Sequence, residues 1–171
     1  SNLELDVYSS FKIYGWEHRD EPYKELFDYC RNHPQINYHG SVPNSEVRKA
    51  LQEAHIYAYP NTWLETSCIS LIEAMSAGVF CIHPNYGALY ETAANWTWMY
   101  QWQDNERDHV KSIIDLTSSA IEVYQENDVQ STLLAQKAYV DAFYGWDGRA
   151  MQWKNLMRQL LKDIKNIDYN G

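Results

Sequence analysis

The sequence predicts an α/β fold: a mostly parallel, Rossmann-like sheet flanked by helices, with a helical C-terminal tail. Before Glu106, short apolar runs alternate with amphipathic stretches, a pattern typical of parallel strands joined by right-handed helical crossovers. The run at residues 79–82 is continuously apolar, as in a strand buried on both faces. After Glu106 only helical spacing remains. Because the 171 residues contain no repeat and no Gly/Ser-rich linker, we expect one domain over residues 1–171.

The elements follow from local signals. Residues 3–8 alternate apolar and polar, as a half-buried strand does. Pro22 is expected to open a helix that Pro34 ends. Ser67 can cap a later helix, which Gly78 stops. The predicted strands are residues 3–8, 36–39, 56–59, 79–82 and 98–100, and the later predicted helices are residues 44–54, 67–77, 87–94, 106–124, 129–144 and a last one after Asp147.

Composition excludes several function classes. The net charge of −9 disfavours nucleic acid as a partner. No apolar run approaches the roughly 20 residues of a membrane span, and no signal peptide is evident. Three cysteines without CxxC spacing predict no disulfide framework and no zinc site, and free thiols indicate a cytoplasmic protein. Trp146 and Trp153 are expected to pack among the tail helices.

One predicted loop carries a candidate site. In a parallel sheet, ligands bind beyond the carboxyl ends of the strands. Glu65 precedes the helix at residues 67–77, Glu73 lies inside it, and the residues between them are small or apolar. Uncovered amides and the helix dipole favour a phosphate there, and a carboxylate suits the hydroxyls of a ribose. The alternative is structural: an acid near a helix start suits the dipole, and Glu73 is then a solvated helix residue.

These motifs resemble family 4 retaining glycosyltransferases with the GT-B fold. Glu65 and Glu73 match the E-x7-E motif of that family, and residues 73–78, Glu-Ala-Met-Ser-Ala-Gly, match its EAM-(small)-AG signature. The segments 39–42, 85–91 and 144–150 resemble its hGxV, xxGxxxE and fsWexxA motifs in the same order. The resemblance extends from about Leu3 to Leu161 and is to the C-terminal, donor-binding half of the GT-B fold.

The resemblance implies roles by position. Glu65 would hold hydroxyls of the transferred sugar and is the candidate catalytic residue, and Glu73 would hold the ribose. Gly87 and Glu91 have a weaker claim to the site. The implied donor-binding residues are Gly40, Ser41 and Val42 beside the base, Glu65 and Thr66, the backbone of Ser67, Cys68 and Ile69 on the pyrophosphate, and Glu73. Cys68 stands where many relatives have glycine, and is read as a small residue there or, alternatively, as a catalytic thiol.

The resemblance also implies partners. The substrate would be a nucleotide-diphosphate sugar, with no cofactor and no metal. An Arg–Lys pair for the leaving diphosphate and the whole N-terminal acceptor domain are expected upstream of Ser1, so this chain alone is expected to bind donor weakly and to transfer no sugar. The alternatives are a non-catalytic nucleotide-sugar-binding or scaffolding module, and a flavodoxin-like signalling domain, which would need an acidic cluster that residues 8–10 do not offer.

Overall fold

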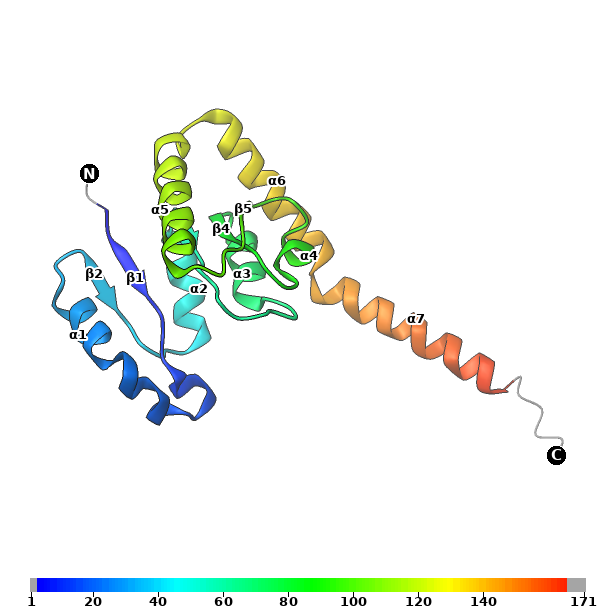
Figure 1. Ribbon diagram of the computed structural model, residues 1–171. Helices are drawn as coiled ribbons and strands as arrows, with labels where there is room; N and C mark the ends of the chain where they lie inside the picture. The colour runs from blue at the N-terminus through cyan, green and yellow to red at the C-terminus, as the bar shows by residue number, and fades with distance from the viewer. Residues whose placement is uncertain (1–2, 166–171) are drawn as a thin grey trace. The chain divides into compact units, whose positions relative to one another are not determined.

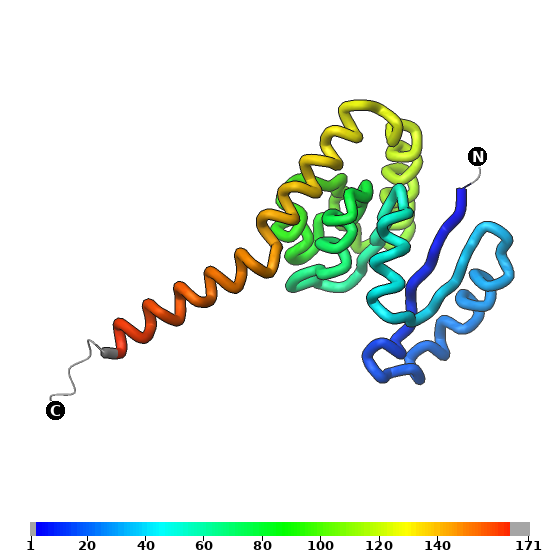
Figure 2. Tube along the Cα trace, turned by 180° about the vertical axis from the view of Figure 1, so that it is seen from behind, coloured from blue at the N-terminus to red at the C-terminus, as the bar shows by residue number. Residues whose placement is uncertain are grey.

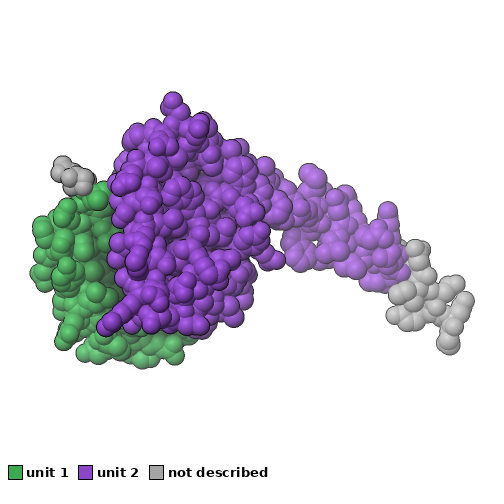
Figure 3. Space-filling view, turned by 45° about the horizontal axis from the view of Figure 1, so that its top comes forward, with its two compact units in different colours: residues 1–50 green, residues 51–171 purple. Residues whose placement is uncertain are grey.

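The computed structural model describes residues 3–165 and divides into two compact units, residues 1–50 and 51–171 (Figures 1 and 3). The described residues contain five strands, in a two-stranded and a three-stranded sheet that are both parallel. The predicted α/β class with parallel strands, flanking helices and a helical C-terminal tail is therefore confirmed. No helix in residues 3–165 has the length and apolar character that crossing a membrane requires.

Unit 1 is held together by aromatic packing of its helix on its sheet. The ring of Phe27 stacks on that of Tyr38, with centroids 4.9 Å apart. The prediction that Pro22 opens the helix is wrong, because Pro22 lies inside a 3-10 helix and the α-helix begins at Lys24. The elements of unit 1 are β1 (Leu5–Val7), the 3-10 helices η1 (Phe11–Tyr14) and η2 (Glu17–Tyr23), α1 (Lys24–Asn32) and β2 (Ile36–Tyr38), and the unit boundary falls within α2 (Asn44–Glu53).

Unit 2 is built around a three-stranded sheet with the order β3-β4-β5. The central strand β4 is buried from Phe80 through Pro84, so both of its faces are covered, as its apolar sequence predicted. The elements of unit 2 after α2 are β3 (Ile56–Ala58), α3 (Ile69–Ala77), β4 (Phe80–Asn85), α4 (Leu89–Ala93), β5 (Trp98–Gln101), α5 (Glu106–Val123), α6 (Asn127–Phe143) and α7 (Trp146–Lys165).

One apolar cluster of unit 2 lies between this sheet and the two helices that follow it. Phe80 and Ile82 of β4 pack with Ala120 of α5 and Leu133 of α6. Figure 2 shows α5 and α6 as the two arms of a helical hairpin. The tail helices α5 and α6 therefore complete the core of the three-stranded sheet.

A buried glutamine joins α6 to the end of α3, the helix along which α6 packs. The side-chain nitrogen of Gln136 donates to the carbonyl oxygens of Met75 and Val79, at 3.4 and 3.0 Å. Carbonyl groups at the C-terminal end of a helix lack helical partners. Gln136 therefore supplies donors at the point where α3 ends and β4 approaches.

The last helix, α7, does not share in this core. It continues from the end of α6 and leaves the rest of unit 2 in both views (Figures 1 and 2). Trp146 is 88% exposed and Trp153 is 60% exposed, so the prediction that they pack among the tail helices is wrong. The reason is that the body of unit 2 ends with α6. The apolar side chains of α7 recur at three- and four-residue spacing and form one exposed stripe: Trp153, Leu156, Met157, Leu160, Leu161 and Ile164.

His83 of β4 is fully buried and bonded on both ring nitrogens. Its Nδ1 lies 3.0 Å from the carbonyl oxygen of Pro84, and its Nε2 lies 2.7 Å from Oγ1 of Thr97. Burial lowers the pKa of His83, and the hydrogen bond to Pro84 opposes that effect only in part. The ring is therefore neutral, with its proton on Nδ1 donated to Pro84, and the hydroxyl of Thr97 donates to Nε2.

This neutral histidine makes stability depend on pH. Below about pH 6.5 His83 binds a proton in the unfolded chain but stays neutral in the folded protein. The free energy of unfolding therefore falls as pH drops. Above that pH the contribution is complete and constant. The loss cannot exceed about 1.4 kcal/mol per pH unit for one group.

We expect the free energy of unfolding to fall more steeply between pH 6.5 and pH 5 in the wild type than in His83→Gln, by roughly 1 kcal/mol over that interval. Urea unfolding at a series of pH values measures both slopes, and the variant removes only the His83 contribution from the background of other histidines. Parallel slopes in the two proteins would show that folding does not lower the pKa of His83.

Candidate functional site

The loop after β3 begins with a turn that a buried asparagine closes. The side-chain oxygen of Asn61 accepts from the backbone nitrogen of Trp63 at 2.9 Å, and its side-chain nitrogen donates to the Trp63 carbonyl at 2.5 Å. Asn61 is only 6% exposed. An asparagine that bonds the backbone two residues on imitates a backbone turn. This turn directs the chain toward Glu65.

Tyr59 fixes the carboxylate of Glu65. The Tyr59 hydroxyl donates to Oε1 of Glu65 at 2.7 Å, and Glu65 is half-buried. Burial, reinforced by this hydrogen bond, raises the pKa of the Tyr59 phenol well above its usual value. The phenol therefore stays protonated and remains a donor at any physiological pH. One oxygen of Glu65 is thereby held in place at the carboxyl end of β3.

Gly87, in the turn after β4, packs directly on the backbone of Glu65. A Cβ at Gly87 would lie 2.5 Å from the Glu65 carbonyl oxygen and 2.8 Å from its nitrogen, and Gly87 has φ +59°. The nitrogen of Ala88 donates to the same Glu65 carbonyl at 2.8 Å. Only glycine allows both this left-handed conformation and this close approach. Gly87, which the sequence connected only weakly with the site, therefore supports the loop that carries Glu65.

The N-cap of helix α3 lies one residue after the predicted one. The N-cap residue is Cys68, not Ser67, and its side chain makes no capping hydrogen bond. The first turn of α3 contains no acidic residue, so the positive end of the helix dipole is not offset within that turn. Thr66, Ser67 and Ile69 are exposed around this end. The segment can therefore receive an anion.

The thiol of Cys68 is buried rather than reactive. Cys68 is 3% exposed, and its sulfur lies 3.4 Å from the hydroxyl oxygen of Ser70. Burial raises the pKa of this thiol, so it stays protonated near neutral pH. Of the two readings of Cys68, the chemistry of the site supports that of a small residue over that of a catalytic thiol.

The predicted site residues lie in two places. Glu65, Thr66, Ser67, Cys68, Ile69 and Glu73 form one segment that runs from the loop after β3 into α3, where Glu73 is half-buried. Gly40, Ser41 and Val42 belong to unit 1, follow β2 and are half-buried. Gly40 has φ +63°, which turns the chain directly after that strand.

Two residues that support the loop were not predicted. In the sequence, Tyr59 is indistinguishable from any aromatic residue at the end of a strand. His109 is likewise indistinguishable from any residue in the first turn of α5. His109 is 5% exposed, and its Nε2 lies 3.3 Å from the Tyr100 hydroxyl and 3.4 Å from the Pro60 carbonyl oxygen. Both act through contacts between residues distant in the sequence or across a turn. The only sequence signal for the role of Tyr59 is its position six residues before Glu65, the first Glu of the motif.

The parallel sheets, the flanking helices and the helical tail define an α/β protein of the Rossmann-like type. Residues 7–126, more than half of the chain, match the family model for "Glycosyl transferases group 1". The chain therefore belongs to the group 1 glycosyl transferases. A comparison with curated proteins found no match.

Two solved structures have a similar fold. One is a glycosyltransferase from Rickettsia africae ESF-5, with a TM-score of 0.67 and 17% sequence identity, and the match covers 97% of this chain and 41% of that chain. The other is a sucrose-phosphate synthase from Thermosynechococcus elongatus, with a TM-score of 0.68 and 19% identity, covering 95% of this chain and 39% of that chain. This chain thus spans about two fifths of the length of either relative.

Replacing Gly87 by alanine should destabilise unit 2 by more than the cost of its backbone conformation. Gly78→Ala is the matched control, because Gly78 also has a positive φ but its nearest neighbour, Lys137 Cδ, is 4.0 Å from the added Cβ. The control should lose about 1–2 kcal/mol of unfolding free energy. Gly87→Ala should lose about 1–3 kcal/mol more, since its Cβ meets backbone atoms. Equal losses in urea unfolding would mean that the two loops are not packed this closely.

Proposed function

We propose that this chain is the donor-binding domain of a retaining glycosyltransferase, which transfers a sugar from a nucleotide diphosphate to an acceptor. The observation that carries the proposal is the anchored carboxylate of Glu65 at the start of α3, in a chain of the group 1 family. A fixed acceptor oxygen suits sugar hydroxyls, and the adjacent helix end suits a diphosphate. Rigid placement of both is what a transferase needs from its donor site.

In the proposed site each residue binds one part of the donor. Glu65 accepts hydrogen bonds from hydroxyls of the transferred sugar. The backbone of Ser67, Cys68 and Ile69, with Thr66 beside it, holds the pyrophosphate at the positive end of α3. Glu73 binds the ribose hydroxyls. The proposal includes no metal or other cofactor and a cytoplasmic location, and catalysis comes from positioning and from stabilisation of the leaving diphosphate.

The exposed stripe of α7 supports a further domain as partner. Six apolar side chains of α7 share one face, and each is at least 46% exposed. Contiguous exposed apolar surface marks interaction sites. We propose that the acceptor domain of the full-length protein covers this helix.

Loss of either carboxylate should weaken nucleotide-diphosphate binding without unfolding the protein. Glu73→Gln should weaken binding of the cognate diphosphate about 10- to 100-fold, because hydrogen bonds to charged groups contribute about 1.5–3 kcal/mol. Glu65→Gln should instead affect the sugar-loaded donor more than the bare diphosphate. Calorimetric titrations with uridine, guanosine and adenosine diphosphates and their sugars test both, with Glu122→Gln on the exposed surface of α5 as control. Unchanged affinity in Glu73→Gln would make Glu73 a structural residue.

The chain by itself should transfer no sugar. Transfer needs donor and acceptor held together, and such positioning supplies about 7–11 kcal/mol of the barrier. This chain spans about two fifths of either solved relative, so we expect the acceptor side to come from elsewhere. Incubation with a panel of nucleotide sugars and acceptors, followed by mass spectrometry of products, is the test. Glycosylated product above a no-protein control contradicts the proposal, and donor binding without turnover in the full-length protein would support the non-catalytic alternative.

A further inference from the structure

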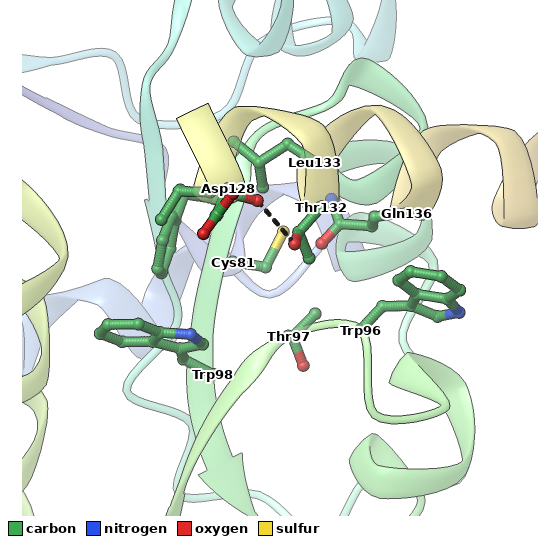
Figure 4. A pocket seen from close by; sticks show the side chains of 10 residues that line it. Cys81, Trp96, Thr97, Trp98, Asp128, Thr132, Leu133 and Gln136 are labelled. Carbon is green, nitrogen blue, oxygen red and sulfur yellow. Dashed lines mark hydrogen bonds between the residues drawn. The ribbon is translucent and has the colours of Figure 1, made fainter. Parts of the chain in front are cut away.

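A cavity lies in unit 2, at the end of the sheet opposite to the proposed donor site. Its volume is about 170 Å³. Phe80 and Trp98, which line it, are the first residues of β4 and β5, whereas Glu65 and Gly87 follow the last residues of β3 and β4. Figure 4 shows the cavity between the sheet and α6, with Trp96 and Trp98 on either side.

The oxygen of Gln136 is a buried acceptor without a partner. Gln136 is fully buried, and its Oε1 is one of two buried side-chain atoms without a hydrogen bond in the part of the chain that the structure describes. The orientation of its amide is fixed by chemistry. The nitrogen must face the carbonyls of Met75 and Val79, which only accept, so the oxygen faces the other way (Figure 4). A lone buried acceptor of this kind is costly unless a donor reaches it.

The hydroxyl and thiol groups of the cavity wall have already used their donors. Thr132 donates its hydroxyl to the Asp128 carbonyl oxygen at 2.8 Å, and the hydroxyl of Thr97 is directed at His83. The thiol of Cys81 donates to the Val79 carbonyl at 3.3 Å, and burial raises the pKa of this thiol well above its usual value. The wall therefore offers acceptor oxygens, from Gln136 and Thr132, and no free hydroxyl donor among its described groups.

The remaining wall is apolar. Phe80, Trp96, Trp98, Val129 and Leu133 supply aromatic and aliphatic surface. Phe80 and Trp98 already meet edge to face, with centroids 4.8 Å apart. A cavity of about 150 Å³ suffices to hold a benzene molecule, so this one admits a single small ring system.

We propose that this cavity binds a small uncharged aromatic molecule through an O–H or N–H group that donates to Gln136 Oε1. The ring lies between Trp96 and Trp98, and the donor group points toward α6. A phenol or an indole has this chemistry. An aromatic carboxylate does not, because its negative charge would face the acceptor oxygen of Gln136 and the carboxylate of Asp128 at the rim.

The test compares ligands that differ only in the donor. Phenol and indole are titrated into the ¹⁵N-labelled chain, beside anisole and 1-methylindole, which keep the ring and lose the donor. We expect saturable shifts of the Gln136 side-chain amide and of the Trp96 and Trp98 indole signals. The methylated partners should bind about tenfold more weakly, because they leave the buried acceptor unpaired. Benzoate should not bind.

A matched pair of variants locates the site. Thr132→Phe places a ring in the cavity and should abolish phenol binding, whereas Ser131→Phe adds the same ring on the exposed surface of α6 outside the wall and should leave binding unchanged. Thermal unfolding checks that both variants fold. Equal affinity for phenol and anisole, shifts that avoid Gln136, or no binding by any of the compounds would each overturn the proposal. Because nucleotide sugars are not used, the outcome is independent of the proposed donor site.

Discussion

The contact that positions the candidate site is the close approach of Gly87 to the backbone of Glu65. A side chain at residue 87 would stand 2.5 Å from a carbonyl oxygen, so the loops after β3 and β4 can meet only through glycine. The meeting is reinforced by the bond from Ala88 to the same carbonyl. Tyr59 then orients the Glu65 side chain from below, at the end of β3. Removal of either support would leave the carboxylate on an unsupported loop, where a binding geometry cannot be held.

Much of the fold could be predicted from the sequence because its signals are local. Gly78 predicted the end of α3, and the apolar run beginning at Val79 predicted the buried strand β4. Both signals lie within a few residues of the feature that they predict. The cap of α3 was misplaced by one residue. Ser67 has the better capping side chain, but the helix starts where Cys68 can be buried, and burial outweighs capping preference there.

Gly87 and Tyr59 could not be assigned from the sequence as supports of Glu65, because that role depends on tertiary contacts. Gly87 lies more than twenty residues from Glu65, and nothing in its own neighbourhood shows which backbone it will meet. The same is true of Gln136, which bonds residues Met75 and Val79 across the α3–α6 contact. For α7 the error was the opposite one, since packing was predicted where the structure has none. Its apolar period is real, but period alone does not show what covers the stripe, and Trp146 and Trp153 remain exposed.

Helix α3 connects the two ends of the sheet. Its first turn forms the proposed phosphate site, and its last residues lead to the carbonyls that Gln136 binds. Nine residues of helix span about 13 Å, and a helix moves as a rigid element over that length. A ligand that bonds the oxygen of Gln136 polarises the same amide whose nitrogen holds the end of α3. The two sites therefore share one mechanical element although they share no residue, and the Gln136–α3 contact is one physical connection between the aromatic cavity and the proposed donor site.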